Sequence, residues 1–500
     1  MSITRREFLT QATAAGVCSA TGLLAADTKR ATVAPMGRRP NILYVILEDI
    51  GPNLSCYGEP LVRTPHLDRF AAEGIRFANA FCTAPVCSAS RSALMTGCYQ
   101  TFIGAHHHRT WEWNKKDLAA PVRHLCDWFR QAGYFTCNLQ RSAEERVAAH
   151  GATTGAAGNG KIDLNFRVAG PREGDPFDGI SWDQRQPGQP FFAHITIFET
   201  HKGAGWKLAR QQPKDELVDP DKLKLPLYYP DHPVARDEYA NYLDAIHQSD
   251  GFFAQLLQRL EDEGLARNTI VVVSSDHGPL FRGKQFVYDN GLRIPLMVRF
   301  PDRREAGKVD SRLVSGVDIA PTLLGLAGIT APAGAMQGRD ILAAGGRPRS
   351  EVFAARDRMD IAVDRMRAVR TDRFKYIRNY LSAVAYMQSN PYKEQEYPTW
   401  NLVKQLQAEG KLSAEAALFA APTKPIEELY DLAADPDELR NLALDPAYSD
   451  TLRDLRARLD AWVAATDRGV VYEDPVDIYR GFYRHLPDEP APQPRRAGPA

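Results

Sequence analysis

The sequence has few cysteines, no net charge and no long apolar run. Its 500 residues include seven cysteines, all in the first third of the chain, and so sparse and odd a set does not indicate a disulfide framework. A Cys56–Cys82 or Cys126–Cys137 pair stays open if the mature protein is extracytoplasmic. The 62 basic residues equal the 62 acidic ones, so bulk nucleic-acid binding is not expected and any anion-binding site must be local. No segment is expected to span a membrane.

Residues 1–26 are predicted to be a twin-arginine export signal. The run Thr4-Arg5-Arg6-Glu7-Phe8-Leu9 precedes a weakly apolar stretch that is too rich in Ala, Thr, Gly and Ser to form a convincing membrane span. The expected location is therefore the periplasm or the secreted fraction, with an uncleaved leader as the alternative. At the other end, the Pro-, Ala- and Arg-rich residues 486–500 are predicted to be a disordered tail.

Residues 40–345 are predicted to form an N-terminal domain of the α/β class. Apolar, β-branched runs over 41–47, 191–198 and 269–275 are typical of strands that are covered on both faces. Helical patterns lie between them, the longest over 234–264. Together they predict a large, mostly parallel (mixed) sheet sandwiched by helices.

Residues 346–485 contain short strand-like segments in place of long apolar runs and are predicted to form a smaller C-terminal α+β subdomain. Short strand candidates over 350–356, 366–370 and 373–378 indicate a short antiparallel sheet. The Ala-, Gly- and Thr-rich residues 143–160 interrupt the pattern of the N-terminal domain, and we expect them to form a flexible surface insertion.

Polar side chains follow each of the three predicted strands of the large sheet. They are Glu48 and Asp49 after the first, His201 after the second, and Asp276 and His277 after the third. In open α/β sheets this edge is where ligands bind. Carboxylates from several strand ends suit Ca²⁺, with Mg²⁺ as an alternative, and the histidine leaves Mn²⁺ open as well. For Glu48 and Asp49 alone, solvated acids at a strand end are the competing interpretation.

The stretch 83–97 carries a cysteine and an arginine at helical spacing. Arg91 follows Cys87 by four residues, so the two side chains share one helical face. The N-terminus of such a helix favours an anion through its free N–H groups. The run His106–His108 follows closely and is either a set of substrate or metal contacts or a structural loop.

A basic stretch from Arg282 to Pro295 follows the third strand. Lys284 and Arg293 within it can hold and neutralise a tetrahedral anion, and Lys284 can also stabilise a leaving oxygen. A basic turn before a buried strand is the alternative interpretation.

The sequence Cys-Ser-Ala-Ser-Arg at 87–91 resembles the Cys-x-Pro/Ala-x-Arg signature of type I, formylglycine-dependent sulfatases of the alkaline-phosphatase superfamily. Further pieces match in family order from about Pro40 to Leu444. They are the 41–49 strand with its acidic pair, Thr64-Pro65-His66-Leu67-Asp68, Asp276-His277-Gly278, the 284–295 stretch, Asp318 to Leu324 and Leu429-Tyr430-Asp431-Leu432. The resemblance implies that residues 40–345 are a catalytic sulfatase domain.

The resemblance also implies a metal site and a modified nucleophile. The implied metal ligands are Glu48, Asp49, Cys87 as formylglycine (3-oxoalanine), Asp276 and His277. Arg91 is implied to orient the modified residue and the sulfate; the residues implied to contact the sulfate and the ester oxygen are Lys161, His201 and Lys284. A formylglycine-generating enzyme or a radical maturase would modify Cys87. The aldehyde hydrate would attack sulfur while His201 or Lys284 assists departure of the alcohol.

The sequence departs from the family pattern at three places. Glu48 stands where the family usually has Asp, and His277 stands where Asn is common. The usual Lys-x-His is absent, and Lys161 in the sequence Gly-Lys-Ile-Asp is the best substitute. None of these changes removes the nucleophile, the arginine or the carboxylate ligands.

The implied function is hydrolysis of a sulfuric ester in a sulfated carbohydrate or an aryl sulfate. A carbohydrate is favoured by family tendency and by the residues His106–His108, Trp111 and Trp113 close to the expected site. A phosphonate monoester or phosphodiester hydrolase with the same nucleophile is the closest alternative. A non-catalytic protein that binds sulfated glycans and keeps Cys87 unmodified is another.

Overall fold

The structure is a computed structural model that describes residues 39–140, 161–171, 174–211, 213, 217–473 and 478. The predicted export signal (1–26), the surface insertion (143–160) and the C-terminal tail (486–500) lie outside these residues. The six described cysteines are unpaired, so neither disulfide that the sequence left open is formed. Within the described ranges, no helix combines the length and the hydrophobicity needed to cross a bilayer.

A seven-stranded mixed sheet forms the centre of the larger part of the chain. Its strands are β1 (Asn41–Leu47), β2 (Ile75–Phe81), β3 (Phe135–Asn138), β4 (Phe191–Ile197), β5 (Thr269–Ser275), β6 (Arg293–Arg299) and β7 (Lys308–Ser315). They are arranged in the order β3-β4-β1-β5-β6-β2-β7. Only β6 runs antiparallel to its neighbours β5 and β2. The prediction of a large, mostly parallel sheet is confirmed.

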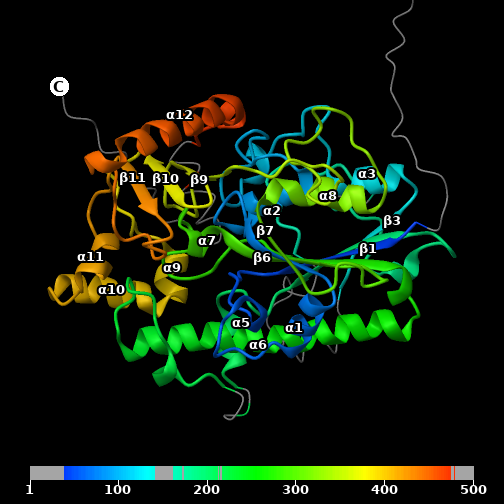
Figure 1. Cartoon of the computed structure of the whole chain (residues 1–500), viewed down its shortest axis with the longest axis horizontal. Coiled ribbons are helices and arrows are strands. Elements are labelled where there is room, and N and C mark those ends of the chain that lie inside the picture. Colours follow the sequence, from blue (N-terminus) through cyan, green and yellow to red (C-terminus); the bar gives the residue numbers. More distant parts are fainter. Residues whose placement is uncertain are drawn as a thin grey trace, which may run out of the picture.

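Helices cover both faces of this sheet (Figure 1). On one side lie α1 (Pro65–Ala72), α5 (Ala204–Ala209) and the long α6 (Pro233–Asp262); on the other lie α2 (Cys87–Thr96), α3 (Leu125–Gln131) and α8 (Ile319–Leu326). All residues of β1, β4 and β5 are buried, as the apolar runs predicted. The short helix α7 (Asp289–Leu292) precedes β6.

The predicted helix before β3 begins at Leu125. His124 occupies its N-cap, and its Nδ1 accepts the N–H of Cys126 at 3.1 Å, which satisfies one of the free donors at the helix start.

A four-stranded antiparallel sheet lies beside the large one, in the order β11-β10-β9-β8. Its strands are β8 (Val352–Arg356), β9 (Met366–Arg370), β10 (Phe374–Asn379) and β11 (Glu427–Asp431). The accompanying helices are α9 (Pro391–Glu396), α10 (Pro398–Ala408), α11 (Ala414–Phe419) and α12 (Ser449–Thr466). One hydrophobic cluster contains both Val273 of β5 and Tyr430 of β11, so the two sheets share a packed core. The boundary near residue 345 stays a prediction.

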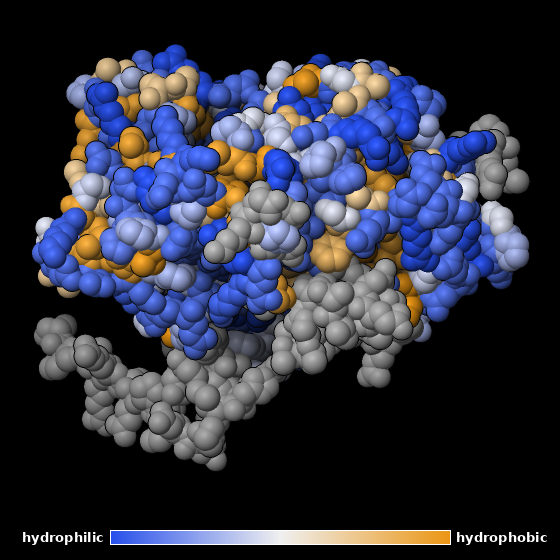
Figure 2. All heavy atoms as spheres, turned by 90° about the horizontal axis from the view of Figure 1, so that it is seen from below, coloured by the Kyte–Doolittle hydropathy of each residue, from blue (hydrophilic) through white to orange (hydrophobic). Residues whose placement is uncertain are grey.

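The face on which α6 lies is mostly hydrophilic (Figure 2). Where this face is drawn in colour, its hydrophobic residues form small clusters among polar ones. This agrees with the amphipathic character of α6, which buries residues such as Tyr242, Leu243 and Phe253 against the sheet.

Candidate active site

The carboxyl ends of β1 and β5 place four polar residues side by side. The two strands are parallel and in register, with Leu47 opposite Ser275, so the residues that follow each strand lie at the same edge. The N–H of Asp49 donates to Oδ1 of Asp276 at 3.0 Å. Asp49 adopts a left-handed backbone conformation, with φ of 49°, which ends the strand and turns the chain at the edge of the sheet.

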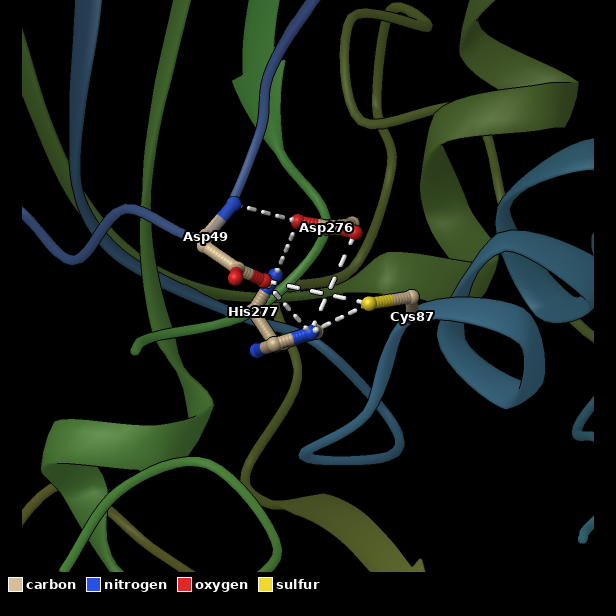
Figure 3. A group of neighbouring side chains, drawn as sticks. All are labelled: Asp49, Cys87, Asp276 and His277. Atoms are coloured by element: carbon tan, nitrogen blue, oxygen red, sulfur yellow. Dashed lines mark hydrogen bonds and ion pairs between the residues drawn. The ribbon is translucent and has the colours of Figure 1, made fainter. Parts of the chain in front are cut away.

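Cys87 reaches this edge from the first residue of α2 (Figure 3). Its Sγ lies 3.3 Å from Nε2 of His277 and 3.8 Å from Oδ1 of Asp49. One ligand atom from each of Asp49, Cys87, Asp276 and His277 lies within 4.8 Å of the others, and all four residues are buried. We call these four residues the Cys87 group.

The donor atoms of the Cys87 group fit a divalent cation. Nδ1 of His277 lies 3.0 Å from the carbonyl oxygen of Gly278, which can only accept a hydrogen bond. Nδ1 therefore carries a proton, and Nε2, 3.1 Å from Oδ1 of Asp49, is the ring nitrogen that would face a bound cation. Two carboxylates and an imidazole nitrogen suit Ca²⁺, Mg²⁺ or Mn²⁺ better than zinc, which favours more nitrogen and sulfur ligands.

Glu48 lies beside the Cys87 group and faces cations. Its carboxylate forms ion pairs with Arg91 and with Lys161. Its closest grouping of ligand atoms is with Cys87 and His201, separate from the four above. The structure therefore brings Glu48 to the site, while its role as a metal ligand stays a prediction.

Arg91 ties several parts of the site together. It is buried, and its Nε lies 3.2 Å from Oδ2 of Asp276, while another guanidinium nitrogen pairs with Glu48. Its Nη1 also donates to the carbonyl oxygen of Lys161 at 2.9 Å. The guanidinium thus fixes the segment that carries Lys161 against the carboxyl ends of β1 and β5.

Two further predicted residues converge on Asp49. Nζ of Lys284 lies 2.8 and 3.0 Å from its two carboxylate oxygens. Nε2 of His201 lies 4.0 Å from Oδ2 of the same residue, and the imidazole stacks on Phe198 with 4.5 Å between ring centroids. The loops after β4 and β5 therefore both deliver their basic side chains to the Cys87 group.

The cations around Cys87 determine its ionisation. Burial alone would raise the pKa of the Cys87 thiol, but the charges of Lys161, Lys284 and His277 hold it well below its usual value. Burial likewise opposes the charged form of Asp49, and the ammonium of Lys284 outweighs it and lowers the pKa of that carboxyl. The site is therefore arranged to stabilise an anion at the Cys87 position.

The carboxyl of Asp276 and the imidazole of His277 are shifted in the other direction. Burial and the neighbouring charge of Glu48 raise the pKa of Asp276 to about 6. Burial would lower the pKa of His277, but the charges of Asp276, Cys87 and Asp49 raise it to about 9. Perturbed pKa values of this kind cluster at functional sites.

The comparisons with known proteins agree with this geometry. A model of the sulfatase family matches residues 40–329, which is more than half of the chain. The chain belongs to the sulfatase family. A second model, described as the C-terminal part of N-sulphoglucosamine sulphohydrolase, matches residues 276–409 of this sulfatase. The predicted resemblance to sulfatases of the alkaline-phosphatase superfamily is confirmed, and the chain is a sulfatase.

Characterised relatives extend over most of this sulfatase. An ulvan-active sulfatase from Formosa agariphila is 35% identical over 481 residues, which cover 87% of this chain and 77% of the relative. The N-sulphoglucosamine sulphohydrolase of Homo sapiens is 26% identical over 500 residues, covering 87% of this chain and 93% of the relative.

Solved structures share the fold of this sulfatase. A protein in complex with its substrate D-glucosamine-2-N,6-O-disulfate superimposes with a TM-score of 0.56 at 20% identity, covering 86% of this chain and 99% of that chain. The phosphonate monoester hydrolase of Agrobacterium radiobacter gives a TM-score of 0.59 at 18% identity, covering 86% of this chain and 96% of that chain. At these identities the likeness concerns the fold alone.

The three histidines at 106–108 of this sulfatase do not all lie at the site. His108 lies at the site, with a ring nitrogen grouped with Cys87 and Asp163, and its Nδ1 lies 3.1 Å from Oδ1 of Asp360. His106 and His107 bond instead to the carbonyl oxygen of Val471, at 3.1 and 2.8 Å.

The structure thus directs His106 and His107 to Val471 and not to the Cys87 group, and the expectation that the whole run contacts substrate stays a prediction. Both side chains are buried against the segment that follows α12, and sequence proximity to Cys87 could not reveal this distant partner.

Arg293 is the other predicted substrate contact that the structure does not bring to the Cys87 group. It is the first residue of β6, and its Nη2 donates to the carbonyl oxygen of Ala78 at 2.8 Å. The guanidinium thus links β6 to β2. This position agrees with the alternative of a basic turn before a buried strand, and contact of Arg293 with the substrate anion stays a prediction.

Four residues at the site escaped the sequence analysis. They are Arg109, Asp163, Asp360 and Tyr392. Asp163 occupies the second position after Lys161, where the family pattern has its histidine, and this spacing was the one available signal. Tyr392 of α9 places its hydroxyl 3.4 Å from Nζ of Lys284, and nothing in the local sequence links that helix to the large sheet.

Proposed function

We propose that this sulfatase removes sulfate from a sulfated carbohydrate, with Cys87 as the precursor of its nucleophile. The observation that carries the proposal is the position of Cys87 Sγ, 3.3 Å from His277 and 3.8 Å from Asp49, with the cations of Lys161 and Lys284 close by. The carbohydrate is supported by the names of the relatives, an ulvan-active sulfatase and an N-sulphoglucosamine sulphohydrolase.

Cys87 in the proposed active form is formylglycine, installed by a formylglycine-generating enzyme or a radical maturase. The hydrated aldehyde supplies an oxygen nucleophile for sulfur where the gene encodes a thiol. The signature Cys-Ser-Ala-Ser-Arg at 87–91 supports this modification. The buried setting of Cys87 at the first residue of α2 keeps the reacting group oriented toward Asp49 and His277.

The proposed metal is Ca²⁺, with Mg²⁺ or Mn²⁺ as alternatives, held by Asp49, Asp276 and His277 together with the modified residue 87. When bound, the cation stabilises negative charge on the nucleophile and on the ester oxygens. Glu48 either is a further metal ligand or neutralises the charges of Arg91 and Lys161, with which its carboxylate forms ion pairs.

Three cationic residues have proposed roles toward the substrate. Arg91 orients the residue at position 87 and Lys161 holds the sulfate, because both carry permanent positive charge beside Cys87. Lys284 stabilises or protonates the leaving oxygen: its neighbours, above all Asp49, raise its pKa well above the usual value despite burial, so the ammonium form persists. His201, at the edge of the same group, is the second candidate for that proton.

The proposed compartment is the periplasm or the secreted fraction. The support is the twin-arginine pattern in residues 1–26. A fractionation experiment with full-length protein, with and without Arg5 and Arg6 replaced by lysine, tests this point. Retention of the double variant in the cytoplasm is expected, and equal export of both forms would contradict the assignment.

Turnover measurements test the proposed reaction. Purified protein is expected to hydrolyse 4-nitrophenyl sulfate and to release sulfate from ulvan oligosaccharides faster than it hydrolyses bis(4-nitrophenyl) phosphate or a phenyl phosphonate ester. Faster turnover of the phosphorus esters would favour the phosphonate or phosphodiester alternative, which the fold shared with a phosphonate monoester hydrolase keeps relevant. Binding of ulvan without turnover, unchanged in Cys87→Ala, would favour a non-catalytic glycan-binding protein.

A further inference from the structure

The tryptophans of this sulfatase divide sharply by burial. Five of the seven are buried in the core, each at most 7% exposed, namely Trp128, Trp182, Trp206, Trp400 and Trp462. Trp113 is 53% exposed, and Trp111 is partly exposed. Their rings are stacked, 6.0 Å apart with 21° between the planes. The chain therefore presents one pair of indoles to solvent.

This indole pair directly follows a segment that contacts the neighbourhood of Cys87. Arg109, two residues before Trp111, donates its backbone N–H to Oγ of Ser88 at 2.7 Å, and Ser88 is the neighbour of Cys87. The preceding residue, His108, has its imidazole at the site. The segment from residue 108 to residue 113 thus leads from the reacting centre to the surface.

Arg109 lies between these two places along the chain and pairs with Asp163, another residue at the site. Its Nε lies 3.7 Å from Oδ2 of Asp163, and 56% of the side chain is exposed. A partly exposed guanidinium can pair with an anionic group of a substrate. It lies between the Cys87 group and the indoles along the segment.

The backbone of the segment is fixed before any substrate binds. Asn165 accepts the N–H of Thr110 at 3.0 Å through its Oδ1, and the guanidinium of Arg358 lies 5.1 Å from the Trp111 ring centroid on one side of that ring. Nη1 of Arg358 also donates to the carbonyl oxygen of His108 at 3.0 Å. A rigid, exposed aromatic surface loses little conformational entropy when a ligand stacks on it.

We propose that Arg109 and the Trp111–Trp113 pair form a subsite for a second sugar unit, next to the unit whose sulfate ester lies at Cys87. The apolar face of a pyranose ring stacks on the exposed indole of Trp113, and a sulfate or carboxylate group of the same chain pairs with Arg109. The inference rests on the proposed function and adds that the substrate is an anionic oligosaccharide rather than a single sugar.

Affinity gel electrophoresis in ulvan tests the subsite without requiring turnover. Full-length Trp113→Ala is expected to bind ulvan about tenfold more weakly than the wild type, and Trp113→Phe, which keeps an aromatic face, is expected to stay within about threefold. Leu418→Ala, at a site on α11 that is 52% exposed, is the matched surface control with wild-type affinity. Equal affinity of Trp113→Ala and the wild type would overturn the proposal.

Activity ratios separate this inference from the proposed function. For Trp113→Ala, kcat/KM on ulvan oligosaccharides relative to kcat/KM on 4-nitrophenyl sulfate is expected to fall about tenfold, because the aryl ester has no second sugar. An unchanged ratio would overturn the subsite while leaving the reaction intact. If the wild type binds ulvan more tightly than Trp113→Ala does but hydrolyses neither substrate, the proposed reaction is refuted and the subsite is supported.

Salt dependence tests the contribution of Arg109. The affinity of the wild type for ulvan is expected to fall as ionic strength rises, and Arg109→Gln is expected to bind more weakly at low salt with a shallower dependence. Parallel salt curves for the two proteins would contradict an anionic contact at Arg109.

Discussion

Replacement of Lys161 by methionine tests the proposed contact between this lysine and the sulfate. The ammonium of Lys161 pairs with the buried carboxylate of Glu48 and lies 3.6 Å from Oδ2 of Asp163. It is also the largest attractive influence on the ionised form of Cys87. Methionine keeps much of the length and volume of the lysine stem while removing the charge, so the change isolates the cation.

The expected loss follows from the proposed contact between Lys161 and the sulfate. Removal of one preorganised donor to a developing anion costs about 3–4 kcal/mol, or about 100- to 1,000-fold in kcat. Glu48 keeps its ion pair with Arg91, so the loss of stability is expected to be smaller, about 1–3 kcal/mol. Turnover must therefore fall much more than the folded fraction does.

The assay is hydrolysis of 4-nitrophenyl sulfate, with thermal unfolding of the same preparations. Lys411→Met is the matched control, because Lys411 also pairs with a glutamate but is 68% exposed; it is expected to keep wild-type turnover. A folded Lys161→Met protein with kcat within about threefold of the wild type would refute the reasoning and leave the lysine of the family pattern unassigned.

Three further outcomes are expected. Asp276→Asn is expected to bind Ca²⁺ at least about tenfold more weakly than the wild type in calorimetric titration, since one of two buried carboxylates is lost; equal affinity would place the cation elsewhere. Arg91→Lys is expected to lose at least about 100-fold in kcat, because one ammonium cannot pair with both Glu48 and Asp276 as the guanidinium does; retention of activity would contradict its orienting role. Burial and nearby Arg130 lower the pKa of His124 to about 3, so the unfolded chain takes up a proton below about pH 6.5 that the native state does not. Between about pH 7 and pH 5 the free energy of unfolding is therefore expected to fall by about 2 kcal/mol more for the wild type than for His124→Asn. Urea titrations at several pH values measure this free energy, and an equal pH dependence for the two proteins would contradict the reasoning.

The large sheet and the edge where its polar residues meet were predictable because the signals are local. Strands β1 and β5 are buried along their whole length, so their hydropathy alone marks them. Their parallel pairing then brings Asp49 and Asp276 together, as the strand-end rule requires. The direction of β6 carried no such signal, because an antiparallel strand buried on both faces has the same apolar composition as a parallel one.

The contributions of the smaller part of the chain were not predictable. Tyr392 reaches Lys284 and Asp360 reaches His108 only because the two sheets pack on one core. The orientation of His106 likewise depends on Val471, 365 positions away. Contacts between such distant segments leave no spacing in the sequence from which they could be inferred.

The central claim is that Cys87 is the precursor of the nucleophile, and mass spectrometry of its peptide tests this claim most directly. The wild type, purified from a host that exports it, is expected to carry an aldehyde in place of the thiol at residue 87. The fraction modified is expected to scale with specific activity across preparations. A peptide that holds only the unmodified thiol in a preparation fully active on 4-nitrophenyl sulfate would contradict the account.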